Sequence, residues 1–176
     1  MAQHNYGLIR RGTGNAVLES IAVPKLPDDY VLVRTIAIAL NPTDWTTLEA
    51  PGDDGTLIGC DYAGTIEELG ESMRGRFKKG DRVAGFGHGE DDANPQHGAF
   101  AIYIATKGAL AFRIPDGVSY EEACTVTCGV GSAGFGLYHV LGLPLPEADA
   151  KPSNGTILIY GGSTATGTIA IQLAKL

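Results

Sequence analysis

The sequence is poor in cysteine, in positive charge and in long apolar runs, and each shortage argues against a class of protein. Its three cysteines, Cys60, Cys124 and Cys128, are odd in number and lack the spacing of a secreted disulfide scaffold. Thirteen lysines and arginines stand against 20 acidic residues, giving a net charge of −7. We therefore expect neither nucleic acid nor an anionic membrane as the main partner. No stretch approaches the 18 apolar residues of a membrane span, and no signal peptide is visible, so a cytoplasmic location is expected.

The composition is that of a globular protein. Apolar residues make up 44% and charged residues 19% of the 176 positions, which is long enough for one ordinary domain and a little more. The 25 glycines favour turn-rich β structure and close backbone approaches.

The first 115 residues have the punctuation of a β domain. Apolar or alternating runs at 31–40, 62–69, 81–86 and 99–105 are separated by glycine, proline and aspartate turns, which predicts a small barrel or sandwich. A polar loop at 88–98 contains His88, Asp91, Asp92 and His97, and a metal cluster there is conceivable. Because all four lie in one loop without fixed spacing, we favour a solvated loop.

The pattern becomes helical after residue 116. Ser119 and Glu122 fit a capping box, which predicts a helix continuing through Thr127. A second helix is expected over 132–141, ended by Gly142. Residues 143–152 contain three prolines and are expected to form an extended connector.

The last 21 residues have the pattern of a nucleotide-binding turn. An apolar strand is predicted at 157–160, a glycine turn at Gly161 and Gly162, and a helix over 167–176. A strand, glycine turn and helix in this order commonly hold the pyrophosphate of a dinucleotide. The glycine spacing is not the strict Gly-x-Gly-x-x-Gly, so the pattern alone leaves a plain tight turn open.

Several short segments of the sequence are informative through their order and spacing. They are Asn41-Pro42-Thr43-Asp44, Gly59-Cys60-Asp61-Tyr62-Ala63-Gly64, Lys79-Gly80-Asp81-Arg82-Val83, Gly98-Ala99-Phe100-Ala101 with Tyr103, Leu141 to Pro146, and Gly161-Gly162-Ser163-Thr164-Ala165-Thr166-Gly167. In this order the segments resemble the zinc-free branch of the medium-chain dehydrogenase/reductase superfamily, and most closely the fungal trans-acting enoyl reductases of polyketide pathways. Ile102 stands where that branch usually has glutamate, within its Gly-x-Phe-Ala-Glu-Tyr pattern.

The resemblance implies a mixed α/β fold. A GroES-like β-barrel domain on the substrate side would occupy residues 1–115. Crossover helices and the first β-α unit of a Rossmann-type doubly wound domain would occupy 116–176. The family's nucleotide domain has further strand–helix units, so we expect a chain truncated within that domain, possibly inactive for that reason.

The resemblance also assigns the cofactor positions. Two sets of four residues are expected to bind NADPH. The first set precedes the last helix, and the second set, around Asp44, is expected on the nicotinamide side of the cofactor. For Asp44 the residues alone also allow a turn or helix-cap role. Many trans-acting enoyl reductases have lysine at the position of Thr46, a charge that threonine cannot supply. The two sets are Ser163, Thr164, Ala165 and Thr166, and Thr43, Asp44, Trp45 and Thr46.

The glycine-rich stretch at 128–135 matches the family's substrate-lining segment. Close helix packing is an equally good explanation of its glycines. No catalytic residue is assigned. No metal is expected, because Thr43 and Asp44 offer no thiolate and no further His or Cys pair completes a zinc site with Cys124 and Cys128. The stretch is Cys128, Gly129, Val130, Gly131, Ser132, Ala133, Gly134 and Phe135.

The activity that the resemblance implies is NADPH-dependent reduction of an α,β-unsaturated acyl thioester, with a polyketide synthase as the possible carrier of the substrate. Two alternatives stay open. One is a quinone or alkenal oxidoreductase, and the other is a non-catalytic protein-binding remnant.

Overall fold

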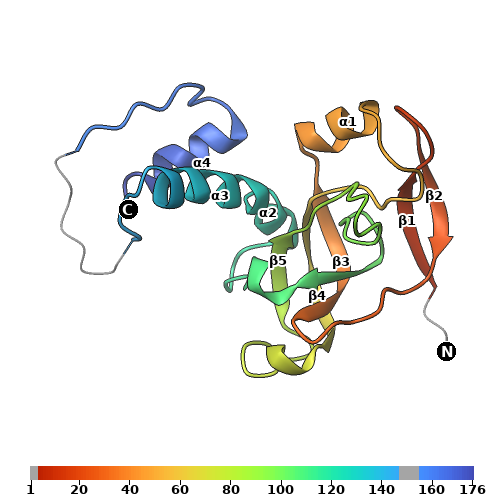
Figure 1. Ribbon diagram of the computed structural model, residues 1–176. Helices are drawn as coiled ribbons and strands as arrows, with labels where there is room; N and C mark the ends of the chain where they lie inside the picture. The colour runs from red at the N-terminus through yellow and green to blue at the C-terminus, as the bar shows by residue number, and fades with distance from the viewer. Residues whose placement is uncertain (1–3, 147–154) are drawn as a thin grey trace. The chain divides into compact units, whose positions relative to one another are not determined.

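The computed structural model describes residues 4–146 and 155–176 (Figure 1). The chain divides into two compact units, with the boundary in the sequence between Thr127 and Cys128. The first unit is built mainly of strands and the second of helices. The expected division near residue 115 concerns the domains of the family and stays a prediction.

Seven strands form the first unit. A five-stranded antiparallel sheet has the order β6-β3-β4-β5-β7, and β1 and β2 form an antiparallel pair. Single bridges from Gly7 to Ala101 and from Ile9 to Leu57 join β1 to the loops of the larger sheet. The bounds are β1 Asn5–Arg10, β2 Ala16–Ile21, β3 Tyr30–Ala39, β4 Asp61–Leu69, β5 Arg82–Phe86, β6 Tyr103–Lys107 and β7 Ala111–Arg113.

Helices and helical turns connect these strands. The first unit contains α1 Pro42–Glu49, the 3-10 turns η1 Glu71–Met73 and η2 Gly108–Leu110, and α2 Tyr120–Cys124. From the boundary onward follow α3 Thr127–Gly134, the π-helical segment η3 Phe135–Val140 and α4 Ala165–Leu173.

The main core lies between the two sheets. Val31, Val33, Ile66 and Val83 are completely buried, and Ile104 is nearly so. Burial of such side chains contributes about 1.5–3 kcal/mol each relative to leaving them exposed. A second, smaller cluster joins Ala63 and Ala84 of the sheet to Ala123 and Cys124 of α2 and to Ile114, and it holds α2 against the sheet.

Three of the predicted strands are confirmed, at β3, β4 and β5, within one residue at each end. The fourth is confirmed only from Tyr103 onward. Before it, the Phe100 N–H donates to the Ile58 carbonyl, whereas the Ile102 N–H donates to the Tyr6 carbonyl. The chain changes pairing partner between these residues, and this interrupts the strand.

The predicted helix start at Ser119 is confirmed in atomic detail. The Glu122 N–H donates to Ser119 Oγ at 3.1 Å, and the Ser119 N–H donates to Glu122 Oε2 at 2.8 Å. The helix ends at Cys124, however, and α3 begins at Thr127 rather than at 132. The predicted end at Gly142 is confirmed by its φ of 68° directly after the η3 segment. Of the expected connector at 143–152, the part beyond residue 146 lies outside the described residues.

The strand predicted at 157–160 is not formed. These residues pair with none of the described strands, and Leu158 and Tyr160 are almost fully exposed. A strand needs a neighbour for its N–H and C=O groups, and the described chain places none beside this segment. The helix that should follow is present as α4.

Gly64 of β4 lies where β4 packs tightly against the backbone of β3. A Cβ at this position would lie 2.2 Å from the Arg34 carbonyl oxygen of β3. The pairing register of β3 with β4 shifts at this point, between Thr35 and Ala37. Gly64 therefore permits the irregular pairing that bends the sheet.

A buried ion pair holds α1 on the barrel. Arg10, at the end of β1, has 2% of its side chain exposed, and its Nη1 lies 3.0 Å from Glu90 Oε2. The same guanidinium donates to the carbonyls of Thr47 (3.0 Å) and Ala50 at the C-terminal end of α1. A cation there is favoured by the helix dipole. Burial raises the pKa of Glu90, and the Arg10 charge offsets part of that effect.

We predict that Arg10→Met lowers the free energy of unfolding by about 3–5 kcal/mol, because it leaves the Glu90 carboxylate buried without its partner. Urea denaturation followed by far-UV circular dichroism measures this. The matched control is Arg11→Met, which breaks the exposed Arg11–Glu19 pair and should change the midpoint little. Equal effects of the two variants would contradict the role given to Arg10.

The turn before β5 yields a pH dependence. Burial alone would raise the pKa of Asp81, but hydrogen bonds from the Lys78 N–H and from Arg113 Nε, both at 3.0 Å, lower it below the ordinary value of 3.8. A carboxyl whose pKa is lower in the folded state stabilises the fold above its unfolded pKa. That contribution disappears as the pH falls through the folded pKa.

We therefore expect Asp81→Asn to reduce the free energy of unfolding at pH 6, with a deficit that shrinks steadily below pH 3.8. Urea titrations at several pH values measure the deficit. Asp116→Asn, at an exposed position, serves as the control. A deficit that is constant with pH would show that Asp81 acts through packing alone.

Candidate functional site

The segment 43–46 lies on α1, and within it Asp44 stabilises the start of the helix. The Asn41 N–H donates to Asp44 Oδ2 at 2.7 Å, so Asp44 caps the helix, as the alternative from sequence allowed. Asp44 is 8% exposed, and its Oδ1 is buried without a hydrogen-bond partner among the described residues.

The other three predicted residues of this segment are exposed. Trp45 presents 56% of its surface to solvent. The Thr46 hydroxyl donates to the Pro42 carbonyl at 2.9 Å, and the Thr43 hydroxyl lies 3.3 Å from that of Thr47. Helix α1 therefore offers a large aromatic surface and two hydroxyls already engaged locally, and no charge comes from these three positions.

A buried carboxylate fixes the start of α1. Asp61, at the first position of β4, is 1% exposed. Its Oδ2 accepts a hydrogen bond from Asn41 Nδ2 at 2.9 Å, and its Oδ1 accepts one from the Thr127 hydroxyl. Burial, followed by the Asp61 charge, raises the pKa of the Cys124 thiol. This buried thiol is consequently a poor nucleophile.

The corner that precedes α4 brings together all four residues predicted for the phosphate side. Thr164 is the N-cap: its Oγ1 accepts from the Gly167 N–H at 3.0 Å and donates to the Gly161 carbonyl at 2.8 Å. Ser163, Thr164, Ala165 and Thr166 are all exposed. The N–H groups of Ala165 and Thr166 have no acceptor within the described part of the chain.

Gly167 closes this corner. A Cβ at Gly167 would lie 2.1 Å from the Gly161 carbonyl oxygen and 2.9 Å from the Gly162 Cα, so any side chain would force the turn open. Unpaired N–H groups at a helix start, beside small residues and hydroxyls, form an anion site, because the helix dipole also favours negative charge there. The corner thus fits a phosphate of a dinucleotide.

The stretch 128–135 forms α3 and the first residue of η3. Ala133 is buried, and a Cβ at Gly129 would lie 2.4 Å from Ile169 Cδ1 of α4, so the stretch serves helix packing at these positions. Val130, Ser132 and Phe135 are exposed, whereas Cys128, Gly131 and Gly134 are half-buried. A substrate-lining role for the exposed members stays a prediction.

The polar loop at 88–98 is organised by Asp91. This carboxylate lies 3.6 Å from His88 Nδ1 and 3.4 Å from His97 Nδ1, and it accepts hydrogen bonds from Asn94 Nδ2 and the Ala93 N–H. The Asn94 hydrogen bond is the main cause that lowers the pKa of Asp91. No group of three or more potential metal ligands gathers among the residues that the structure describes.

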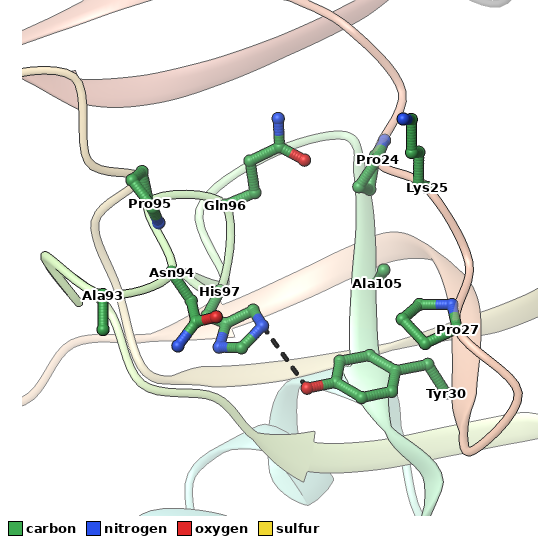
Figure 2. Close-up of a pocket in the computed structure, with 10 residues that line it drawn as sticks. All are labelled: Pro24, Lys25, Pro27, Tyr30, Ala93, Asn94, Pro95, Gln96, His97 and Ala105. Carbon is green, nitrogen blue, oxygen red and sulfur yellow. Dashed lines mark hydrogen bonds between the residues drawn. The ribbon is translucent and has the colours of Figure 1, made fainter.

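The sequence analysis missed a cavity beside this loop, shown in Figure 2. It has a volume of about 340 Å³ and is lined by Lys25 and Tyr30 on one side and by residues 93–97 on the other. Tyr30 Oη and His97 Nε2 are 3.3 Å apart. The prolines at 24, 27 and 95 were the available signal in the sequence for this cavity. Because three separate segments of the chain line it, no local pattern could predict that they come together. None of the predicted site residues lines it.

None of the helices in the described part of the chain has the length and apolar character needed to cross a membrane.

Comparison with known proteins agrees with this architecture. Residues 27–116, just over half of the chain, match the alcohol dehydrogenase GroES-like domain. The trans-enoyl reductase TOXD of Cochliobolus carbonum is 51% identical over 154 residues, covering 88% of this chain and 52% of that protein. The trans-enoyl reductase resD of Aspergillus sclerotiorum is 46% identical over 171 residues, covering 92% of this chain and 48% of that protein.

Among solved structures, an alcohol dehydrogenase superfamily protein from Novosphingobium aromaticivorans superimposes with a TM-score of 0.80 at 25% identity, over 97% of this chain and 50% of that one. The chain spans about half the length of these curated relatives. With its GroES-like domain, its relatives and its fold in agreement, the chain belongs to the medium-chain dehydrogenase/reductase superfamily, among proteins similar to fungal trans-enoyl reductases.

Proposed function

We propose that this chain serves the NADPH-dependent, zinc-independent reduction of α,β-unsaturated acyl thioesters of the kind assembled by polyketide synthases. The observation that carries the proposal is the corner before α4. There the absence of a side chain at Gly167 allows a tight turn, Thr164 caps the helix, and the N–H groups of Ala165 and Thr166 remain available. The relatives named trans-enoyl reductases, which match most of this chain, support the same reaction class.

In this proposal the residues of the corner hold the cofactor. The N–H groups of Ala165 and Thr166 and the hydroxyls of Ser163, Thr164 and Thr166 would bind phosphate oxygens of NADPH. The bound nicotinamide supplies the hydride for the reduction. The choice of NADPH over NADH rests on the family.

Helix α1 contributes an exposed face on the nicotinamide side. Thr43, Trp45 and Thr46 would contact the cofactor, whereas Asp44 acts indirectly by capping the helix that presents them. Arg10 and Asp61 fix the two ends of the same helix. Because both ends of α1 are fixed, its exposed face would keep one position during the reaction.

The exposed residues of α3 and η3 are proposed to meet the substrate. Val130 and Phe135 are 41% and 61% exposed and offer apolar surface to an acyl chain, with the Ser132 hydroxyl between them in sequence. Cys128, Gly131 and Gly134 leave room close to the backbone. Gly129 and Ala133 stabilise this segment through helix packing, Gly129 against Ile169 of α4.

The domain organisation belongs to the same proposal. A GroES-like domain over residues 1–115 and the beginning of the nucleotide-binding domain over 116–176 agree with a GroES-like match that ends at residue 116. We place the protein in the cytoplasm, where NADPH and an acyl carrier are both available to it.

The purified 176-residue chain tests this function directly. We expect NADPH to bind with a micromolar dissociation constant, measured by the enhancement of nicotinamide fluorescence. We also expect crotonyl-coenzyme A, a soluble α,β-unsaturated thioester, to be reduced at a rate that EDTA leaves unchanged. A simple quinone, assayed in parallel, should be a much poorer substrate.

The contrary outcomes are distinct. Faster turnover of the quinone than of the thioester would assign the chain to quinone reduction. NADPH binding without turnover of either would leave a cofactor-binding protein that needs further protein for catalysis. Absence of NADPH binding would contradict the proposal and favour the non-catalytic binding role.

We predict that Gly167→Ala weakens NADPH binding at least about tenfold, since the added methyl group meets the Gly161 carbonyl oxygen and must displace the turn. Fluorescence titration measures the affinity, and circular dichroism verifies that the helices remain. Gly136→Ala is the matched control, because a Cβ there meets no atom within 4 Å. Unchanged affinity in Gly167→Ala would remove the phosphate site from this corner.

A further inference from the structure

The cavity beside β6 has two walls from distant parts of the chain. One wall consists of Pro24, Lys25 and Pro27 from the connection between β2 and β3 together with Tyr30, the first residue of β3. The loop 93–97 supplies the facing wall, and Ala105 of β6 lies between them (Figure 2). Its volume of about 340 Å³ lies at the lower end of the range for small-molecule sites. It shares no lining residue with the positions predicted to bind cofactor or acyl substrate.

Two polar contacts of His97 fix the two walls relative to each other. His97 Nδ1 lies 3.4 Å from Asp91 Oδ2, and His97 Nε2 lies 3.3 Å from Tyr30 Oη. The Asp91 carboxylate and the Tyr30 hydroxyl therefore lie beside the two ring nitrogens of His97, so that the ring is held between the two walls. Tyr30 is 8% exposed, so its ring is held in the barrel while its hydroxyl reaches the loop. The cavity is consequently preformed.

Two polar side chains of the cavity, Lys25 and Gln96, offer N–H donors that are available to a ligand. Lys25 is exposed and makes no ion pair with any residue that the structure describes. The side-chain amide of Gln96 likewise makes no hydrogen bond within the described chain. The rings of the three prolines and the Ala105 methyl make the rest of the wall apolar. A cation and an amide beside apolar surface suit an anion that carries a hydrocarbon body.

A second cavity continues the apolar part. Its volume is about 100 Å³, and it shares Pro24, Pro95 and Gln96 with the first. Its further lining includes Ile9, Ile21 and Leu57 of the barrel. A molecule whose charged end lies near Lys25 could therefore place an alkyl chain against the barrel core, where each buried methylene adds favourable free energy.

We propose that these adjoining cavities bind a small aliphatic carboxylate, with Lys25 and Gln96 at the carboxylate and Pro24, Pro95 and Leu57 at the chain. The contacts of His97 with Asp91 and Tyr30 position the loop wall and do not contact the ligand's charge. This site stands independently of the reductase function, because none of its residues takes part in that proposal.

The test uses the intact chain labelled with ¹⁵N and hexanoate as the probe. We expect saturable chemical-shift changes that concentrate on Gln96, His97 and Ala105, with a dissociation constant in the millimolar range or tighter. Acetate, which lacks the alkyl chain, and hexanamide, which lacks the charge, should each bind at least about tenfold more weakly. Equal binding of all three, shifts away from the cavity, or no saturable binding of hexanoate would overturn the proposal.

Variants separate the charge from the architecture. Lys25→Gln should weaken hexanoate binding about tenfold and leave hexanamide binding unchanged. Lys107→Gln, at an exposed lysine on the end of β6 that does not line either cavity, should have no effect on either. Tyr30→Phe should weaken both probes several-fold, because it frees the loop wall. Equal affinities of Lys25→Gln and Lys107→Gln for hexanoate would refute the assignment.

Discussion

The buried carboxylate of Asp61 is the constraint on which the arrangement of the first unit depends. It sits at the first position of β4 and accepts hydrogen bonds from Asn41, directly before α1, and from Thr127, where α3 begins. A buried carboxylate must find donors, because an unpaired charge away from water is very costly. Asp61 thereby ties three segments that are far apart in the sequence.

The two ends of α1 are fixed by opposite charges. Asp61 holds Asn41 at the start, and Arg10 binds the last carbonyls at the end. Between them the helix buries one polar side chain, Asp44, and exposes Trp45. Such a helix is held by its ends more than by an apolar face, so its outer surface stays accessible.

The second unit is held together differently. Its buried side chains are small or few, with Ala133 and Leu137 the buried apolar residues in the described part of it. Close contact of Gly129 with Ile169 and the hydrogen bond from Tyr138 to the Leu173 carbonyl join its helices. Large apolar side chains at Phe135, Leu158 and Tyr160 remain exposed. The barrel therefore accounts for most of the buried apolar surface of the chain.

The sequence was sufficient to predict those parts of the fold that local pattern determines. The strands at β3, β4 and β5 follow from apolar runs closed by turn residues, and the start of α2 follows from Ser119 and Glu122. The exposed positions at the start of α4 follow from small and hydroxyl residues around glycine. The role of Asp44 as a cap was present among the alternatives.

Non-local pairing accounts for what was missed. Strands β1 and β2 are six residues long, and three of their exposed residues, Tyr6, Val17 and Leu18, are large and hydrophobic, so no clear alternation of buried apolar and exposed polar residues marks them. They form because they pair with each other and are bridged to the loops of the larger sheet. Arg10 and Glu90 are separated by 80 residues, so no local pattern announces their ion pair. The cavity between Lys25 and His97 is likewise a product of tertiary structure. At 157–160 a strand-forming composition was insufficient without a neighbour.

The tight fit of Gly64 against the Arg34 carbonyl gives a structural reason for the last glycine of the segment Gly59 to Gly64. That glycine is required by the pairing of β4 with β3 and is unrelated to the choice of substrate. Descendants of such a gene could lose catalysis and cofactor alike and still keep the residue. A match to this pattern is therefore evidence of the scaffold only, and says nothing about the proposed phosphate site at Thr164.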